Sequence, residues 1–107
     1  MLLFDMKARP TAIFACNDLL AIGVFQAARE RHLSIPGDVS VIGFDNTMFA
    51  SIVDPPLTTI SQPIQDMGRQ VVDVLLKSIN GYRGNKQRVV LSPELVLRSS
   101  VSRPHTT

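Results

Sequence analysis

Two stretches, TAIFACND at 11–18 and VSVIGFDN at 39–46, decide the fold of this chain. Each places a short apolar run directly before two polar residues. Runs of this length are typical of strands that are buried on both faces of a sheet. Residues 18–33 between them have helical spacing, and the crossover is long enough for parallel pairing. The sequence therefore predicts a strand–helix–strand unit with both polar pairs at one edge of the sheet.

The rest of the chain predicts further elements of the same α/β kind. We expect a helical turn near 48–52, a strand at 57–60, an amphipathic helix over 63–79, and a bent strand or two short edge strands within 88–97. The polar tail from residue 99 is expected to fray. Open α/β sheets hold about five or six strands. We therefore interpret the chain as a partial doubly wound parallel sheet, the C-terminal fragment of a larger domain.

The helix at 18–33 is apolar around most of its first two turns. Its helical projection places one group of residues toward the sheet, namely Leu20, Val24, Ala27 and Ala28. A second group points elsewhere and comprises Leu19, Ile22 and Phe25. A helix with two apolar sides needs a second cover, which more of the same domain or another subunit can supply.

The composition limits the class of protein. The chain has 107 residues, of which 45% are hydrophobic and 19% charged, as in ordinary globular proteins. It contains no apolar run of the ~18 residues that cross a bilayer and no secretory signal pattern, so we expect a cytoplasmic protein. The net charge of +2 is scattered along the chain, which argues against DNA binding by these residues. The single cysteine, Cys16, excludes an intrachain disulfide and is interpreted as a small core residue.

No catalytic constellation is found in the sequence. The two histidines, His32 and His105, lack metal-ligand spacing. No serine has the glycine-flanked turn of a hydrolase nucleophile, and no glycine loop could hold a phosphate. We therefore expect no enzyme, no metal site and no cofactor.

The polar residues at the strand ends are the candidate binding residues. Ligands of open α/β sheets bind beyond the carboxyl ends of the strands, where Asn17-Asp18 and Asp45-Asn46 are expected to lie. Amide and carboxylate groups can read the hydroxyls of a sugar or the N–H groups of a nucleobase. We interpret Asp18 as a helix N-cap. On position alone, Asn17 and Asp45 can be ligand contacts or local structural residues, and Gln62 can cap the next helix or contact a ligand.

Several motifs together resemble one bacterial family. They are AIFACND at 12–18 with AIG at 21–23, IPGDVSVIGFDN at 35–46, PLTTISQP at 56–63 with MG at 67–68, and LVLRSS at 95–100. In this order and spacing they are similar to the LacI/GalR repressors, over roughly residues 8–103. The resemblance implies the C-terminal part of a periplasmic-binding-protein-like sensor. In such a sensor the effector lies between two lobes, and operator DNA is bound only by an N-terminal domain that this chain lacks.

Position by position, the resemblance implies effector contacts by Asn17, Asp45 and Gln62. It also implies a homodimer interface, carried by Ile22, Gln26, Phe49 and Ile52. The effector would be a sugar or a nucleobase-like molecule. The alternative function is a transport-linked solute-binding protein of the same fold, which a signal peptide upstream would favour.

The resemblance also implies a division into lobes. Residues 1–62 would belong to the second lobe, and residues 63–94 would return to the first lobe. Residues 95–107 would cross back and form the tail.

Overall fold

The computed structural model describes residues 2–81 and 88–104. The chain divides into two compact units, which are Met1–Ser61 with Glu94–Thr107, and Gln62–Pro93. We call them the larger and the smaller unit. The assignment of 1–62, 63–94 and 95–107 to lobes stays a prediction, and its residues 82–87 and 105–107 lie outside the described part of the chain.

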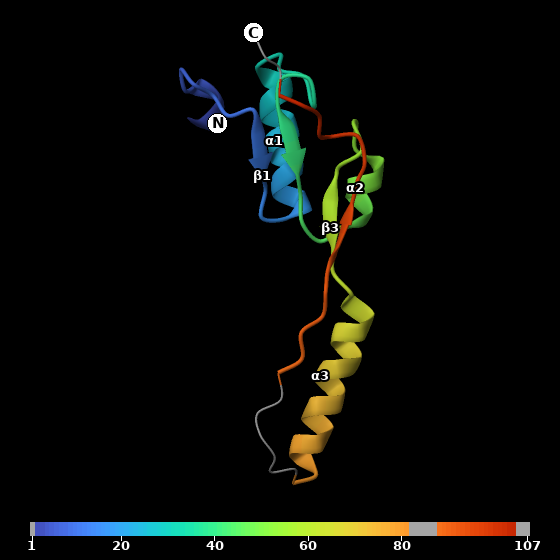
Figure 1. The fold of residues 1–107 in the computed structure, drawn as a ribbon. Coiled ribbons are helices and arrows are strands. Elements are labelled where there is room, and N and C mark those ends of the chain that lie inside the picture. Colours follow the sequence, from blue (N-terminus) through green and yellow to red (C-terminus); the bar gives the residue numbers. More distant parts are fainter. Residues whose placement is uncertain (1, 82–87, 105–107) are drawn as a thin grey trace. The chain divides into compact units, whose positions relative to one another are not determined.

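Short strands that pair two by two form the sheets of the larger unit (Figure 1). Strand β1 (Ala12–Phe14) pairs in parallel with β2 (Ser40–Ile42), and β3 (Thr59–Ser61) pairs antiparallel with β4 (Glu94–Val96). Beyond β2 the chain continues beside β3, because Gly43 N donates to Thr58 O and Asp45 N donates to Ile60 O, both at 2.9 Å. The predicted parallel α/β arrangement is confirmed, with strands shorter than expected.

The N-cap of helix α1 (Asp18–Glu30) is Asn17, not Asp18. The side chain of Asn17 accepts a hydrogen bond from Leu20 N at 2.8 Å, which satisfies one of the helix's free N–H groups. The prediction that Asp18 is the N-cap is therefore wrong. Both residue types cap helices well, and Asp18 is instead used by partners from distant parts of the chain.

The C-terminal end of α1 lies three residues before the predicted one. His32 adopts a left-handed conformation with φ 56°. Its N–H donates to Arg29 O at 3.1 Å, and Leu33 N donates to Ala28 O at 2.8 Å. These two bonds form a Schellman motif, which ends a helix by satisfying its last carbonyls.

The core of the larger unit lies between α1 and the sheet. The buried apolar face of α1 consists of Ala21, Val24, Phe25 and Ala28. The predicted phase is wrong at two positions, since Phe25 is only 7% exposed whereas Leu20 is 55% exposed. The helical period was right, but the buried stripe is centred about one position further along the chain.

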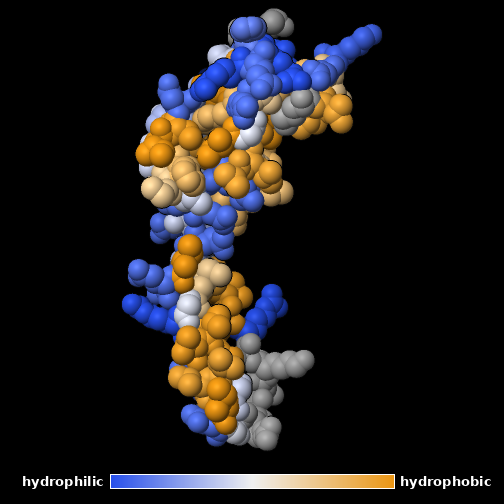
Figure 2. Space-filling view, turned by 180° about the vertical axis from the view of Figure 1, so that it is seen from behind, coloured by the Kyte–Doolittle hydropathy of each residue, from blue (hydrophilic) through white to orange (hydrophobic). Residues whose placement is uncertain are grey.

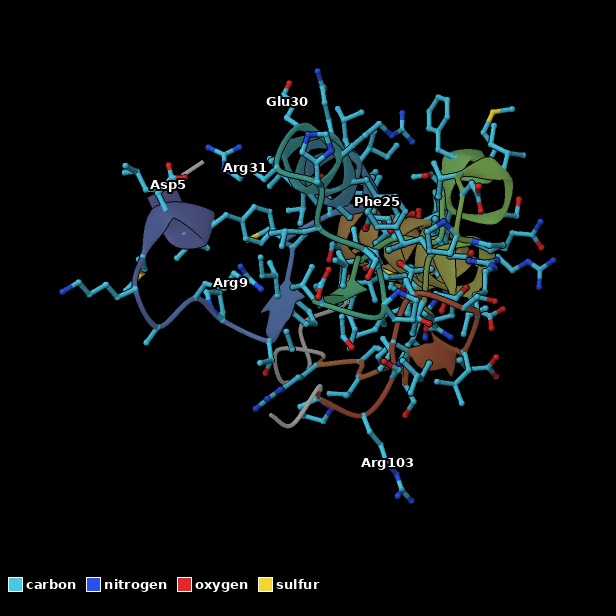
Figure 3. All side chains as sticks on the ribbon, turned by 90° about the horizontal axis from the view of Figure 1, so that it is seen from above. Asp5, Arg9, Phe25, Glu30, Arg31 and Arg103 are labelled. Atoms are coloured by element: carbon cyan, nitrogen blue, oxygen red, sulfur yellow. The ribbon has the colours of Figure 1, made fainter. Side chains whose placement is uncertain are left out.

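Two short helices complete the larger unit. Helix η1 (Leu2–Asp5), which the sequence did not predict, adds Phe4 to the core. It is held to the end of α1 by Arg31 Nε, which lies 3.1 Å from Asp5 Oδ1, and Figure 3 shows the two side chains pointing toward one another. Helix α2 (Met48–Ile52) is confirmed at its predicted position and buries Ala50.

The described part of the tail, residues 99–104, does not fray as predicted, and residues 105–107 lie outside the described residues. Ser100 is fully buried; its carbonyl accepts from Val41 N at 2.9 Å and its hydroxyl oxygen accepts from Thr58 N at 2.8 Å. Ser102 N donates to the hydroxyl of Ser40 at 3.0 Å. Polar composition indicated exposure, but these serines bind backbone groups that would otherwise be buried without partners.

The smaller unit contains helix α3 (Ile64–Ile79), which begins one residue after the predicted start. None of its residues is buried within the described structure. Figure 2 shows hydrophobic side chains gathered along this helix, and the exposed ones include Ile64, Val71, Leu75 and Ile79. Residues 88–93 have no regular structure, so the strand predicted within 88–97 is reduced to β4. Across the described part of the chain, no helix combines the length and apolarity that crossing a bilayer would need.

Candidate functional site

Asn17 lies where the chain leaves β1 and enters α1. Its side-chain oxygen is used by the helix cap, while its Nδ2 group donates to none of the described residues. The residue is half-buried, so that amide nitrogen can reach a ligand at the surface. The neighbouring Cys16 is exposed, and its interpretation as a core residue is wrong. The alternation along β1 explains this, because Ala15 is the residue that faces the core.

Asp45 lies at the corresponding end of β2 and has an unusual backbone. Its φ is 110°, and that of Asn46 is 56°. Positive φ is uncommon outside glycine and costs of order 1–3 kcal/mol per residue. Two such residues in succession turn the chain sharply at the strand end. Strain of this kind gathers at binding and catalytic sites, where the surrounding structure holds it in place.

Asn17 lies next to this turn because the chain after β1 is hydrogen-bonded to the chain after β2. The backbone N–H of Asp18 donates to Phe44 O at 2.9 Å, so the residues that follow β1 lie against those that follow β2. Gln62 follows Ser61, which is the bridge partner of Asp45, and is the first residue of the smaller unit. The predicted juxtaposition of the two strand ends is therefore present in the larger unit.

Asp18 is the buried centre of this end of the sheet. Its side chain is fully buried, and Oδ1 accepts from the hydroxyl of Thr59 at 2.6 Å. The other oxygen, Oδ2, accepts from Thr47 N at 2.6 Å and from the Thr47 hydroxyl at 3.0 Å. One carboxylate thus joins the first turn of α1, the turn after β2 and the start of β3. Hydrogen bonds to a charged acceptor are short and strong, so this arrangement holds the turn in place.

Gly43 allows the carboxylate to sit there. A Cβ atom at this position would meet Asp18 Oδ1 and would lie 2.8 Å from Leu57 Cδ2. Neither neighbour can retreat easily, because both side chains are fully buried. There is therefore a steric reason for glycine at the first position of the sequence Gly43-Phe44-Asp45-Asn46, since a side chain would have no room.

Arg98 is a site residue that sequence reasoning missed. Its Nη2 donates to Asn46 Oδ1 at 2.8 Å, and its Nη1 donates to Leu57 O at 2.9 Å. Its backbone N–H donates to Thr58 Oγ1 at 2.9 Å. The only local signal was an arginine that ends an otherwise apolar run, and such a residue is ordinarily a solvated strand end.

The four residues expected at a dimer interface lie on two helices that contact each other. Ile22 is half-buried and Gln26 is exposed on α1, while Phe49 and Ile52 are 45% and 68% exposed on α2. Leu19, 70% exposed, precedes Ile22 by three residues and Gln26 by seven, which places all three on one helix face. We call these five residues the α1–α2 surface.

In the part of the chain that the structure describes, neither the groove beside β1 and β2 nor a cluster of metal-ligating side chains competes with the strand-end turn. A groove of about 310 Å³ lies beside β1 and β2 and includes Phe14 and Val101, but neither Asn17 nor Asp45 lines it. Among residues 2–81 and 88–104, no three His, Cys, Asp or Glu side chains gather as metal ligands would. The strand-end turn therefore remains the candidate site.

Comparison with known proteins identifies similar chains. Residues 1–101 match the model of the periplasmic binding protein-like domain. The chain is 52% identical over 100 residues to the HTH-type transcriptional regulator DegA of Bacillus subtilis, covering 94% of this chain and 29% of DegA. It spans less than a third of the length of the curated relatives it matches.

Solved structures that are similar to this chain include regulators of the same kind. A LacI family transcriptional regulator from Enterococcus faecium with bound ribose is 36% identical, with a TM-score of 0.80, and the match covers 94% of this chain and 37% of that one. The dimeric Lac repressor with an 11-residue C-terminal deletion is 35% identical, with a TM-score of 0.86, and the match covers 98% of this chain and 38% of that one. These similar proteins are transcription regulators.

Proposed function

From its membership of the periplasmic-binding-protein-like family, we infer that this chain is part of the effector-binding domain of a LacI-family transcription regulator. We propose that it binds a small sugar through Asn17, Asp45 and Gln62. Binding would be its task, with no chemical change to the sugar. Control of operator DNA would pass through a DNA-binding domain outside this chain, in the cytoplasm.

The observation that carries the proposal is the strained turn at Asp45, held at the end of β2 beside the N-cap of α1. A sugar hydroxyl both donates and accepts hydrogen bonds. The carboxylate of Asp45 offers acceptors, and Nδ2 of Asn17 offers a donor from the neighbouring strand end. The ribose bound to the Enterococcus faecium regulator favours a pentose as the first ligand to test.

Isothermal titration calorimetry of the protein with D-ribose, D-glucose and hypoxanthine tests the proposal. We expect at least one sugar to bind, and Asp45→Ala to weaken that binding about 10- to 100-fold, since a hydrogen bond to a charged group contributes about 1.5–3 kcal/mol. Asp73→Ala is the matched control, because Asp73 is an exposed carboxylate on α3 that pairs with Lys77 at 3.4 Å. Absence of binding to both sugars, or equal affinity of Asp45→Ala and wild type, contradicts the proposal, and binding of hypoxanthine alone would contradict the sugar as ligand.

The α1–α2 surface supports a second part of the proposal, a homodimer. Its exposed apolar residues need a cover, and a self-complementary patch is the usual interface of a two-fold dimer. The dimeric state of the similar Lac repressor agrees with this reading.

Sedimentation equilibrium tests the dimer. We expect self-association that Ile22→Glu weakens, because a charge at this position would be buried between the subunits. Ile64→Glu on α3 is the control for a general effect of charge. A wild-type protein that stays monomeric at high micromolar concentration contradicts the homodimer.

A further inference from the structure

We propose that Arg98 is a positioning residue that fixes the Asp45–Thr47 turn and thereby the direction of the Asp45 carboxylate. Its guanidinium bridges two acceptors, Asn46 Oδ1 at 2.8 Å within the turn and Leu57 O at 2.9 Å just before β3. Arg98 thus links the side chain of Asn46, the second residue of the turn, to the segment just before β3.

The turn needs such attachment because its backbone is strained. Asp45 and Asn46 both have positive φ, and a free chain would relax toward the ordinary regions of conformational space. On one side the turn is held by Thr59, whose hydroxyl oxygen accepts from Asn46 N at 3.3 Å, and by the carboxylate of Asp18. On the other side Arg98, which follows β4, holds the side chain of Asn46 by donating to its Oδ1. Removing either support releases one half of the constraint.

The geometry gives Arg98 a positioning role. Each of its terminal nitrogens and its backbone N–H donates to a protein oxygen, which fixes the guanidinium between the turn and the segment before β3. A planar guanidinium can span two acceptors in a fixed arrangement, whereas a lysine ammonium is a single point charge on a flexible stem. Arg98→Lys therefore keeps the charge and removes the bridge.

Arg98 also links the turn to the strand on which the chain returns to the larger unit. Residue 98 comes two positions after the end of β4, which pairs with β3. The backbone N–H of Arg98 donates to Thr58 Oγ1, so the guanidinium and the backbone of one residue bind both the turn and the segment before β3. The strand register therefore determines where the guanidinium meets Asn46.

Hydrogen exchange of the whole protein, followed by mass spectrometry without any ligand, tests the inference directly. In Arg98→Lys we expect the peptide that contains Asn46 and Thr47 to exchange about tenfold faster, while peptides from Ala21–Ala28 keep their wild-type rate. Arg103→Lys is the matched control, since Arg103 is exposed and points away from the rest of the unit in Figure 3. An unchanged rate at Asn46–Thr47, or equal acceleration throughout the larger unit, overturns the inference.

A second measurement connects the turn to binding, and this part rests on the proposed function. The D-ribose affinities of Arg98→Lys and Asn46→Ala should each fall about tenfold, with no further loss in the double variant, because both act through one hydrogen bond. Additive losses, or faster exchange with unchanged affinity, overturn the link to Asp45. If the wild-type protein does not bind D-ribose, this measurement counts against the proposed function. The exchange rates alone then decide whether Arg98 positions the turn.

Discussion

Asp18→Ala is expected to destabilise the fold far more than the loss of a helix cap would. The substitution removes a fully buried carboxylate that accepts from the Thr59 hydroxyl and from the backbone and hydroxyl of Thr47. Nothing in an alanine side chain can replace these acceptors. The Thr59 hydroxyl and the Thr47 amide then lose their partners beneath the turn.

The expected cost follows from these contacts. Three donors lose this acceptor, and the Thr47 hydroxyl can turn to solvent because Thr47 is exposed. Leaving a buried donor without a partner costs about 1–3 kcal/mol, so for the other two donors we expect the free energy of unfolding to fall by about 3–5 kcal/mol. Asp18→Asn should cost less, about 1–2 kcal/mol, because the amide oxygen can still accept from Thr47 while its NH₂ donates to the Thr59 hydroxyl. Asn17→Ala, which removes the actual N-cap, should cost about 0.5–2 kcal/mol.

Urea denaturation followed by far-UV circular dichroism measures all three variants by linear extrapolation. The order of destabilisation should be Asp18→Ala first, with Asp18→Asn and Asn17→Ala well below it. A cost for Asp18→Ala below that of Asn17→Ala would mean that the contacts of Asp18 with Thr47 and Thr59 stabilise the fold less than the helix cap does. That result would refute the network that joins α1 to the turn.

Three further predictions follow from single contacts. Gly43→Ala should lower the free energy of unfolding by about 1–3 kcal/mol in the same denaturation assay, because its methyl group would meet the Asp18 carboxylate; a neutral effect would show that the site has room. Asp45→Gly should be about 1 kcal/mol more stable than Asp45→Ala, since only glycine adopts φ 110° without strain, and equal stability would argue against strain at the turn. The hydrogen bond from Arg31 holds the pKa of Asp5 below its ordinary value, so this contact stabilises the fold above the unfolded pKa and is lost as pH falls through the folded one. Carboxyl shifts in an NMR titration should show that Arg31→Gln raises the pKa of Asp5, and an unchanged value would exclude the pairing in solution.

The arrangement of strands and helices was largely predictable from local patterns. Apolar runs predicted β1 and β2, helical spacing predicted α3, and the helical turn expected near 48–52 is α2. The end of α1 was less predictable, because His32 takes the left-handed position where glycine is usual. No composition signal distinguishes such a histidine from one within the helix.

The details of the site depend on contacts between distant residues, which local patterns do not contain. Asn17 and Asp18 are equally good N-caps by residue type, and the choice between them is made by Thr59, which lies 41 residues from Asp18 in the sequence. Arg98 reaches Asn46 across 52 residues. Buried Ser100 belongs to the same class, since its partners Val41 and Thr58 come from two different segments.

The central claim is that the strained turn at the end of β2 holds a sugar through Asp45. Titration of D-ribose into wild type, Asp45→Ala and Asp73→Ala by calorimetry tests it most directly, with urea denaturation confirming that all three proteins are folded. We predict that wild type and Asp73→Ala bind alike, and that Asp45→Ala binds about 10- to 100-fold more weakly. Equal binding by a folded Asp45→Ala protein would contradict the account.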